Sequence, residues 1–317
     1  MLCRSHWGRQ SCPALAIVRP RFALALVALL AASSAFGGER DAPLKISIVE
    51  AQFRHVPAPL VKLSFRSVQA LVKSQTTLDS EFQLSKDANV LAQQLADDQV
   101  DLGVFHGVEF AWVRQKHKDL RPLVIVVNGE SHVRAHLLVA KDSPVSQFAD
   151  LHGKALAMAN GTRLHCRLFV ERPCQDCGQE PEKFFSRITT PATVEDALDD
   201  IVDGTVAAAV ADGVALDCYK RRKPGRFAKL RELVTAEAFP CPVIAYRAGH
   251  LDGAILQRFK EDLTRAGEQP AAKRVLMLWK ITGFEAIPAN YERSLTEIAK
   301  AYPAPEEEKS ANAGRRD

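Results

Sequence analysis

KDSPVSQFADLHGKALAMANGTR, residues 141–163, is the segment that decides the predicted fold. Its pattern predicts a proline-containing turn, a short helix, and an apolar strand over residues 155–159. The strand is followed by Asn160-Gly161-Thr162, a polar turn that precedes another helix. Because a helix N-terminus carries unpaired backbone N–H groups and partial positive charge, we expect this turn to contact an anionic ligand.

A similar alternation of strands and helices extends to both sides of this segment. Short apolar or β-rich runs predict strands, at residues 44–49, 81–84, 100–105, 120–127, 135–140, 206–210, 230–235 and 243–246. Apolar residues at helical spacing predict helices, at 60–73, 87–95, 107–112, 162–170, 194–202, from 214, and at 254–266, 271–279 and 290–301. We expect the helix that begins at residue 162 to be interrupted at Pro173. Strands that alternate with helices indicate an α/β protein with parallel or mixed sheets.

The first 35 residues have the pattern of a secretory signal peptide. Four arginines and no acidic residue accompany an apolar run over residues 22–32, which ends in small residues up to Ala35. An apolar segment of roughly 7–15 residues is typical of an export signal and is short for a membrane span. We therefore predict export to the periplasm by a cleaved signal, with an uncleaved N-terminal anchor as the alternative.

The charge balance and the motifs exclude several classes of function. Removing the four signal arginines from 42 basic residues leaves 38, against 38 acidic residues, so the remaining chain is formally neutral. A nucleic-acid-binding protein usually keeps a basic excess on its folded domain, so nucleic acid is not an expected partner. The sequence lacks GxSxG, HExxH and glycine-rich nucleotide-binding motifs, so we do not expect an enzyme.

The dipeptides Ser-Pro, Asp-Leu and Gly-Lys, followed by a small-residue strand and a polar turn, resemble the second lobe of type II periplasmic binding proteins. The similarity is to the phosphate, phosphite and phosphonate branch that serves ABC transporters, and it extends from about Leu44 to about Arg247. It implies an α/β fold of two lobes, with mixed sheets and two hinge crossings, that closes on a small anionic ligand without a cofactor. The implied partner is an ABC permease, the implied state is a monomer, and membrane contact is expected only through the transporter or an uncleaved anchor. A ligand-sensing domain of a membrane receptor is the alternative.

The resemblance also predicts how the chain is divided between the lobes. The predicted segments are a signal peptide (1–35), the first part of lobe 1 (36–135), lobe 2 (136–240), the return part of lobe 1 with C-terminal helices (241–302) and a disordered tail (303–317). The tail is charged and rich in Pro, Ala and Glu, a composition that favours disorder. The two crossings are predicted at residues 135–140 and 243–246.

Three histidines and an arginine lie near the predicted strand ends. His106 follows a predicted strand, and open α/β sheets bind ligands beyond the carboxyl ends of their strands. His132, Arg134 and His136 alternate along an extended segment, so they share one side that could face an anion. The alternatives are a helix-capping role for His106 and a solvated basic edge for the other three residues.

Asn160, Gly161, Thr162 and Arg163 occupy the position at which the phosphonate branch has a Ser/Thr-rich turn. Only Thr162 retains a hydroxyl, and Arg163 could replace the lost donors because a guanidinium binds phosphate in a planar fork. The alternative for Arg163 is an ordinary surface arginine. Asp212 follows a predicted strand and could hold a ligand donor or a cleft cation, or else cap the next helix.

The cysteines that follow the signal segment are Cys166, Cys174, Cys177, Cys218 and Cys241. Because exported proteins tend to pair their cysteines, we predict structural disulfides, with Cys166 joined to Cys174 or Cys177. Cys218 and Cys241 form the second predicted pair. The alternative is a thiol- or metal-binding protein that uses the CxxC motif together with His165.

Overall fold

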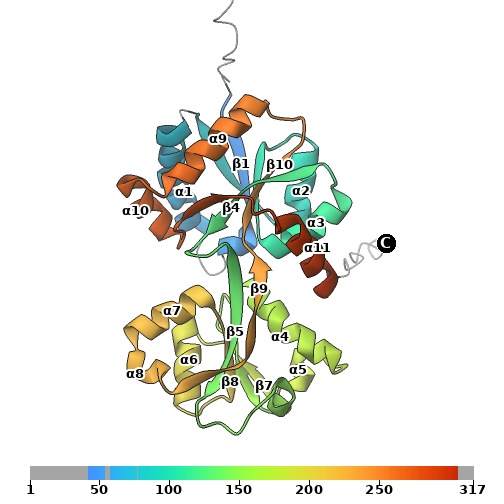
Figure 1. The fold of residues 1–317 in the computed structure, drawn as a ribbon, viewed down its shortest axis with the longest axis vertical. Coiled ribbons are helices and arrows are strands. Elements are labelled where there is room, and N and C mark those ends of the chain that lie inside the picture. The colour runs from blue at the N-terminus through green and yellow to red at the C-terminus, as the bar shows by residue number, and fades with distance from the viewer. Residues whose placement is uncertain (1–41, 54–57, 77, 306–317) are drawn as a thin grey trace, which may run out of the picture. The chain divides into compact units, whose positions relative to one another are not determined.

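The computed structural model describes residues 42–53, 58–76 and 78–305 (Figure 1). The predicted signal peptide (1–35) and residues 306–317 of the predicted tail lie outside the described residues. The described residues form two mixed sheets with helices packed against them, as predicted for a two-lobe α/β fold. Within these residues no helix is both long and apolar enough to cross a membrane.

The first sheet belongs to the lobe that contains both ends of the described chain. Within the described residues it has six strands in the order β11-β4-β10-β3-β1-β2. Their bounds are Leu44–Val49 (β1), Ser80–Ser85 (β2), Leu102–Phe105 (β3), Leu120–Val127 (β4), Val243–Arg247 (β10) and Gly283–Ala286 (β11). Strand β1 is parallel to β2 and β3, whereas β10 is antiparallel to both β3 and β4. The sheet is therefore mixed, and strands from the start and the end of the chain alternate in it.

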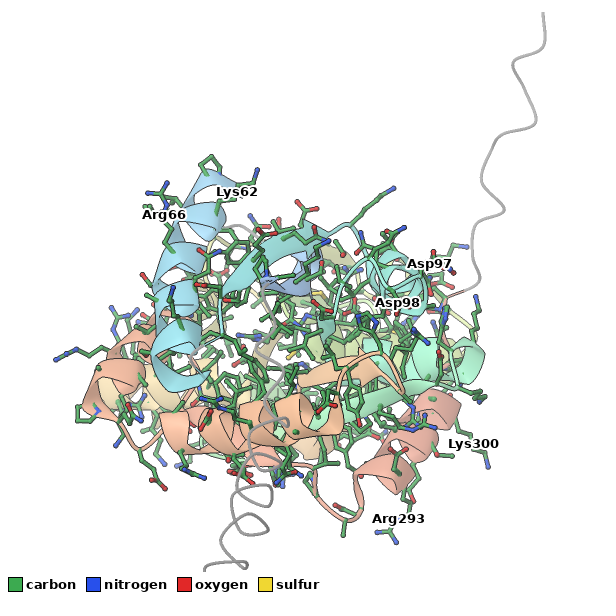
Figure 2. The ribbon with its side chains drawn as sticks, turned by 90° about the horizontal axis from the view of Figure 1, so that it is seen from above. Lys62, Arg66, Asp97, Asp98, Arg293 and Lys300 are labelled. Atoms are coloured by element: carbon green, nitrogen blue, oxygen red, sulfur yellow. The ribbon has the colours of Figure 1, made fainter. Side chains whose placement is uncertain are left out.

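The helices of this lobe place apolar residues against the sheet and charged residues outside. Their bounds are Glu50–Phe53 (the 3-10 helix η1), Ala58–Thr76 (α1), Ala88–Ala96 (α2), Gly107–Lys116 (α3), Gly253–Ala266 (α9), Pro270–Leu278 (α10) and Tyr291–Ala301 (α11). Helix α11 buries Tyr291, Leu295 and Ile298, which lie on one helical face. Its exposed residues include Arg293, which Figure 2 shows pointing away from the core.

The second sheet has, among the described residues, five strands in the order β7-β6-β8-β5-β9. Their bounds are His132–Ala140 (β5), Ala155–Ala157 (β6), Arg187–Thr189 (β7), Ala208–Asp212 (β8) and Leu230–Pro240 (β9). The helices of this lobe are Phe148–Leu151 (the 3-10 helix η2), Leu164–Asp176 (α4), Pro181–Phe184 (α5), Val194–Val202 (α6), Gly213–Arg222 (α7) and Pro224–Phe227 (α8). The alanines of β8 are fully or almost fully buried, so the small side chains of this strand fit a sheet covered on both faces.

The connection between the lobes corrects one predicted crossing. Strands β5 and β9 pair in antiparallel register and run between the two sheets (Figure 1). The first crossing, predicted at residues 135–140, lies within β5. The return crossing was predicted at residues 243–246, but these residues form β10, in the middle of the first sheet. Strand β9 makes the return, because its pairing with β5 continues to Pro240, well beyond the predicted end at residue 235.

Helix α4 is longer than predicted. We expected an interruption at Pro173, but the helix continues to Asp176 with the proline inside it. A proline cannot donate from its own nitrogen, but the following turn is still completed by the Cys177 N–H, which donates to the Pro173 carbonyl at 3.3 Å. The helix ends where Gly178 takes a φ of 71°.

The disulfide prediction is wrong for the described structure. Cys166, Cys174, Cys177, Cys218 and Cys241 are all free. Cys166 and Cys174 lie eight residues apart on α4, so their Cα atoms are about 12 Å apart along a helix that rises 1.5 Å per residue. A disulfide requires Cα atoms within about 7 Å. Residues 42–53, 58–76 and 78–305 also contain no group of three or more His, Cys, Asp or Glu side chains that could hold a metal ion.

Candidate ligand-binding cleft

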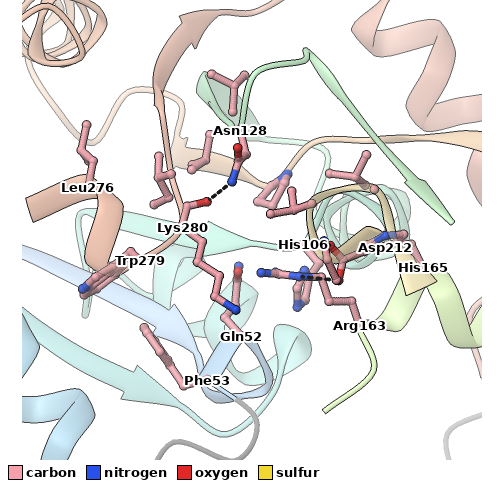
Figure 3. Close-up of a pocket in the computed structure, with 18 of the residues that line it drawn as sticks. Gln52, Phe53, His106, Asn128, Arg163, His165, Asp212, Leu276, Trp279 and Lys280 are labelled. Atoms are coloured by element: carbon pink, nitrogen blue, oxygen red, sulfur yellow. Dashed lines mark hydrogen bonds and ion pairs between the residues drawn. The ribbon is translucent and has the colours of Figure 1, made fainter. Parts of the chain in front are cut away.

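A cleft of about 1480 Å³ is lined by residues of both lobes (Figure 3). Segments that follow the carboxyl ends of the parallel strands β1, β3, β6 and β8 all contribute to its wall. Open α/β sheets bind ligands at such ends, where the backbone turns away and leaves helix N-termini exposed. The topology therefore brings together side chains that lie far apart in the sequence.

His106 lines the cleft from the first lobe, directly before helix α3. Its side chain is almost fully buried, and its backbone N–H donates to the Glu109 carboxylate at 3.4 Å. A Cβ atom on the neighbouring Gly107 would lie only 2.2 Å from the Pro240 carbonyl oxygen. Glycine is therefore required at position 107, because the start of α3 lies directly against the end of β9.

The basic residues His132, Arg134 and His136 of β5 all line the cleft, as does Val133 of the same strand. His132 Nε2 lies 2.8 Å from a carboxylate oxygen of Glu130, and the Arg134 Nε lies 3.7 Å from the same oxygen. His136 Nδ1 lies 3.1 Å from Glu232 on β9. The nearby carboxylates therefore balance much of the positive charge of this row of side chains.

The turn over residues 160–163 lies at the cleft, but only part of it faces the open volume. Asn160, Gly161 and Arg163 line the cleft, and Thr162 does not. The Thr162 hydroxyl donates to the Ala159 carbonyl at 2.6 Å, so it stabilises the turn itself. The Asn160 N–H donates to the Pro191 carbonyl at 2.7 Å, and the Thr162 N–H donates to Ala159 at 3.0 Å. The expectation of bare N–H groups is thus wrong for these two residues.

Arg163 and Asp212 lie close together on the second lobe. Arg163 directly precedes α4, and its Nε lies 3.9 Å from an Asp212 carboxylate oxygen. The other Asp212 oxygen accepts the Ala215 N–H at 3.0 Å and so caps helix α7. Asp212 therefore both caps a helix and holds a cleft cation, two roles that the sequence left open. Figure 3 shows the Arg163 side chain extending from the second lobe toward Gln52 of the first.

Gln52 is a cleft residue that no sequence motif predicted. It belongs to the short helix η1, which follows the carboxyl end of β1. Its side-chain amide nitrogen is buried and has no hydrogen-bond partner among the described residues. An unpaired buried donor that faces a cleft is suited to bind an anion. Its position after a strand end was the only signal in the sequence that could have indicated it.

His165 is the second cleft residue whose place in the site was not predicted. It lies in the first turn of α4, and its side chain is 5% exposed. The ring hydrogen-bonds to the Arg134 backbone carbonyl, and Nε2 has no partner among the described residues. Burial in the protein lowers the pKa of His165 to about 4, although the nearby Asp212 carboxylate opposes this shift. His165 is therefore neutral at physiological pH.

An apolar wall completes the cleft on the side of the first lobe. Phe53 and Trp279 line it, and their rings meet edge to face with centroids 5.2 Å apart. Leu276 lies beside these two rings (Figure 3). Near this wall, the Asn128 side-chain amide donates a hydrogen bond to the Lys280 carbonyl at 2.5 Å. The cleft thus has a polar part around Arg163 and an apolar part against helix α10.

The sequence matches the protein family described as "ABC transporter, phosphonate, periplasmic substrate-binding protein" over residues 59–291. The chain belongs to this family. The match confirms the resemblance given by the order of short motifs, and family members act as substrate-binding proteins of transporters. No curated protein matches the chain.

Several solved structures share the fold of this phosphonate-binding family member. PhnD1 from Prochlorococcus marinus, in complex with methylphosphonate, is 12% identical with a TM-score of 0.58, over 81% of this chain and 97% of that chain. A binding protein component of an ABC phosphonate transporter from Pseudomonas aeruginosa is 15% identical with a TM-score of 0.55, over 81% and 86%. A protein of Xanthomonas citri bound to ATP is 18% identical with a TM-score of 0.58, over 82% and 96%. At these identities the likeness shows the type II periplasmic binding fold.

Proposed function

We propose that this chain is an exported, monomeric binding protein that captures a phosphonate, phosphate or related oxyanion in the periplasm and delivers it to an ABC permease. The observation that carries the proposal is the convergence of donors from both lobes on one cleft. Gln52 presents an unpaired amide nitrogen from the first lobe, and Arg163 presents a guanidinium from the second. A ligand held by both would join the two lobes.

The electrostatics of the cleft favour a small anion. Helices α3 and α7 both begin at the cleft, so their partial positive charges add to that of Arg163. A guanidinium offers a rigid fork of N–H donors that matches a tetrahedral oxyanion. The contact between Arg163 and Asp212 is long, at 3.9 Å, so it leaves the guanidinium able to bind a ligand.

The connection between the lobes supports capture by closure. Strands β5 and β9 link the sheets, and residues 136–240 between them form the proposed mobile lobe. In proteins of this architecture a few residues at such crossings absorb the hinge rotation. Closure would exclude water and strengthen each hydrogen bond to the anion.

Calorimetric titration of the purified protein with methylphosphonate tests the proposal. Replacing Arg163 with alanine should weaken binding about ten- to hundredfold, since a hydrogen bond to a charged group contributes about 1.5–3 kcal/mol. Arg167→Ala is the matched control, because Arg167 lies one turn further along α4, pairs with Glu171 at 3.6 Å, and does not line the cleft. Equal affinity in the Arg163 variant and the wild type would remove Arg163 from the site.

Small-angle scattering provides an independent check of closure. Methylphosphonate at a concentration that just saturates the wild type should reduce its radius of gyration, and the Arg163 variant should show a smaller reduction at the same concentration because it binds more weakly. A wild-type profile that does not change with bound ligand would contradict closure by a hinge.

A further inference from the structure

His165 combines deep burial with an unpaired ring nitrogen at the cleft. Since Nε2 has no partner among the described residues, the hydrogen bond to the Arg134 carbonyl must come from Nδ1. A carbonyl only accepts, so Nδ1 carries the proton of the neutral ring. The tautomer is thereby fixed, and Nε2 is left as a hydrogen-bond acceptor. A buried acceptor without a partner destabilises the ligand-free protein. A ligand that provides a hydrogen-bond donor would remove this cost.

The groups around His165 show which kind of donor can reach Nε2. Asp212 approaches from β8, the Arg163 guanidinium from the start of α4, and His136 from β5. The Phe239 ring of β9 lies 5.6 Å from the imidazole, centroid to centroid, and supports its orientation. His165 therefore lies near both the Arg163 guanidinium that would hold the anion and the Asp212 carboxylate that is paired with it. A donor on the anionic group itself fits this arrangement.

We propose that His165 Nε2 accepts a hydrogen bond from a protonated oxygen of the bound oxyanion, so that the cleft selects phosphonates over sulfonates. This inference rests on the proposed function. A phosphonate monoanion carries two oxygens that share its single negative charge, which Arg163 can bind, and one O–H group for His165. A sulfonate has the same tetrahedral shape but carries no proton at neutral pH, so it would leave Nε2 facing an anionic oxygen.

The cost for a sulfonate follows from the acceptor that it leaves unpaired. To donate to a sulfonate oxygen, the imidazole would have to become charged, which burial opposes, or move its proton from Nδ1 and lose the hydrogen bond to the Arg134 carbonyl. Sites built to hydrogen-bond a ligand hydroxyl discriminate strongly against analogues that lack it. We expect methylphosphonate to bind at least about tenfold more tightly than methanesulfonate at neutral pH.

Calorimetry with these two ligands, on wild type and on His165→Phe, is the central experiment. Phenylalanine fills the volume of the imidazole and keeps the ring contact with Phe239, but it offers no acceptor. The preference for methylphosphonate should fall to within about twofold in this variant. In His136→Phe, the matched control from the same cleft, the preference should persist even if both affinities change. Persistence of the full preference in His165→Phe would overturn the inference.

The pH dependence of the wild type provides a test that does not depend on any variant. Affinity for methylphosphonate should fall by up to about tenfold per pH unit above the second ionisation of this ligand, because the bound O–H is then lost. Affinity for methanesulfonate should not show this fall. An affinity for methylphosphonate that rises with pH would refute the hydrogen bond to Nε2.

Amine-bearing ligands separate the proposed donor from an ammonium donor. If an ammonium group were the partner of Nε2, taurine would bind as tightly as 2-aminoethylphosphonate, and that result would contradict the inference. Equal binding of methylphosphonate and methanesulfonate would refute the selectivity but leave anion capture intact. Failure of every oxyanion to bind would instead refute the proposed function.

Discussion

The neutral, buried state of His165 should make the free protein sensitive to mild acid. Burial lowers the pKa of this side chain from 6.5 to about 4, so the unfolded chain binds the proton more readily than the folded protein does. The free energy of unfolding then falls as the pH falls from about 6.5 towards 4. Above this window both states are neutral at this residue, and the contribution no longer changes.

The size of the effect follows from the two pKa values. The shift from 6.5 to about 4 is about 2.5 units, which corresponds to about 3.4 kcal/mol when the transition is complete. At pH 5 the unfolded histidine is almost fully protonated and the folded one mostly neutral. The loss of stability relative to pH 8 is then about 2 kcal/mol.

Urea unfolding at pH 8 and pH 5 measures this loss. The wild type should lose about 2 kcal/mol more than His165→Phe between the two pH values, and the exposed His152→Gln should behave as the wild type. Hydrogen bonds lower the pKa values of Asp98, Asp150 and Asp199 below 3.8. The stability that these carboxylates contribute is therefore lost only below the two pH values of this comparison. If His165→Phe and the wild type lose the same free energy, the buried neutral histidine is ruled out.

Two other substitutions test the cleft and its support. Gln52→Ala should weaken methylphosphonate binding by about three- to tenfold with little change in melting temperature, because the amide nitrogen has no partner in the described structure. An unchanged calorimetric affinity would contradict its role as a donor. Gly107→Ala should lower the free energy of unfolding by about 2 kcal/mol or more, since its Cβ would lie 2.2 Å from a Pro240 oxygen. Gly213→Ala, whose Cβ would meet its nearest neighbour at 3.4 Å, is the control that should be tolerated in urea unfolding.

Elements with clear local boundaries could be predicted from the sequence. Residues 44–49, 120–127 and 194–202 have the predicted limits, because each apolar pattern ends at residues that stop the element. Helix α6 begins where the Thr193 hydroxyl oxygen accepts the Asp196 N–H at 3.1 Å. Such signals depend only on neighbouring residues.

Features set by distant partners could not be predicted in this way. The pattern of β9 fades after residue 235, yet the strand continues to Pro240 because β5 lies beside it. The short strand β11 exists because it pairs with β4, more than 150 residues earlier. The cysteine pairing failed for a local reason instead: the helix that carries Cys166 and Cys174 was expected to break at Pro173, but it continues to Asp176.

The residues of the candidate site also divide into those that local sequence signals indicated and those that depend on tertiary packing. The strand-end argument indicated His106, Asn160 and Asp212, all of which line the cleft. It could not indicate His165, because the side of α4 that faces the cleft depends on how the helix packs on β5 and β8. The sequence also placed His165 beside the cysteines, which suggested thiol or metal chemistry instead.

The arrangement of charges also explains why short-range hydrogen bonds, rather than long-range attraction, must decide which anion is bound. Glu130 and Glu232 lie against the histidines and the arginine of β5, so that row has little net attraction for an anion at long range. The Asp212 carboxylate, 3.9 Å from the Arg163 Nε, also offsets part of the arginine charge at long range, although the guanidinium remains able to bind a ligand at contact distance. Any small oxyanion would therefore enter the open cleft with similar ease. Discrimination between anions has to arise once the lobes close. Each oxygen of the bound anion then meets a hydrogen-bond donor of the protein, except the oxygen at His165 Nε2, which has to carry a proton and donate it.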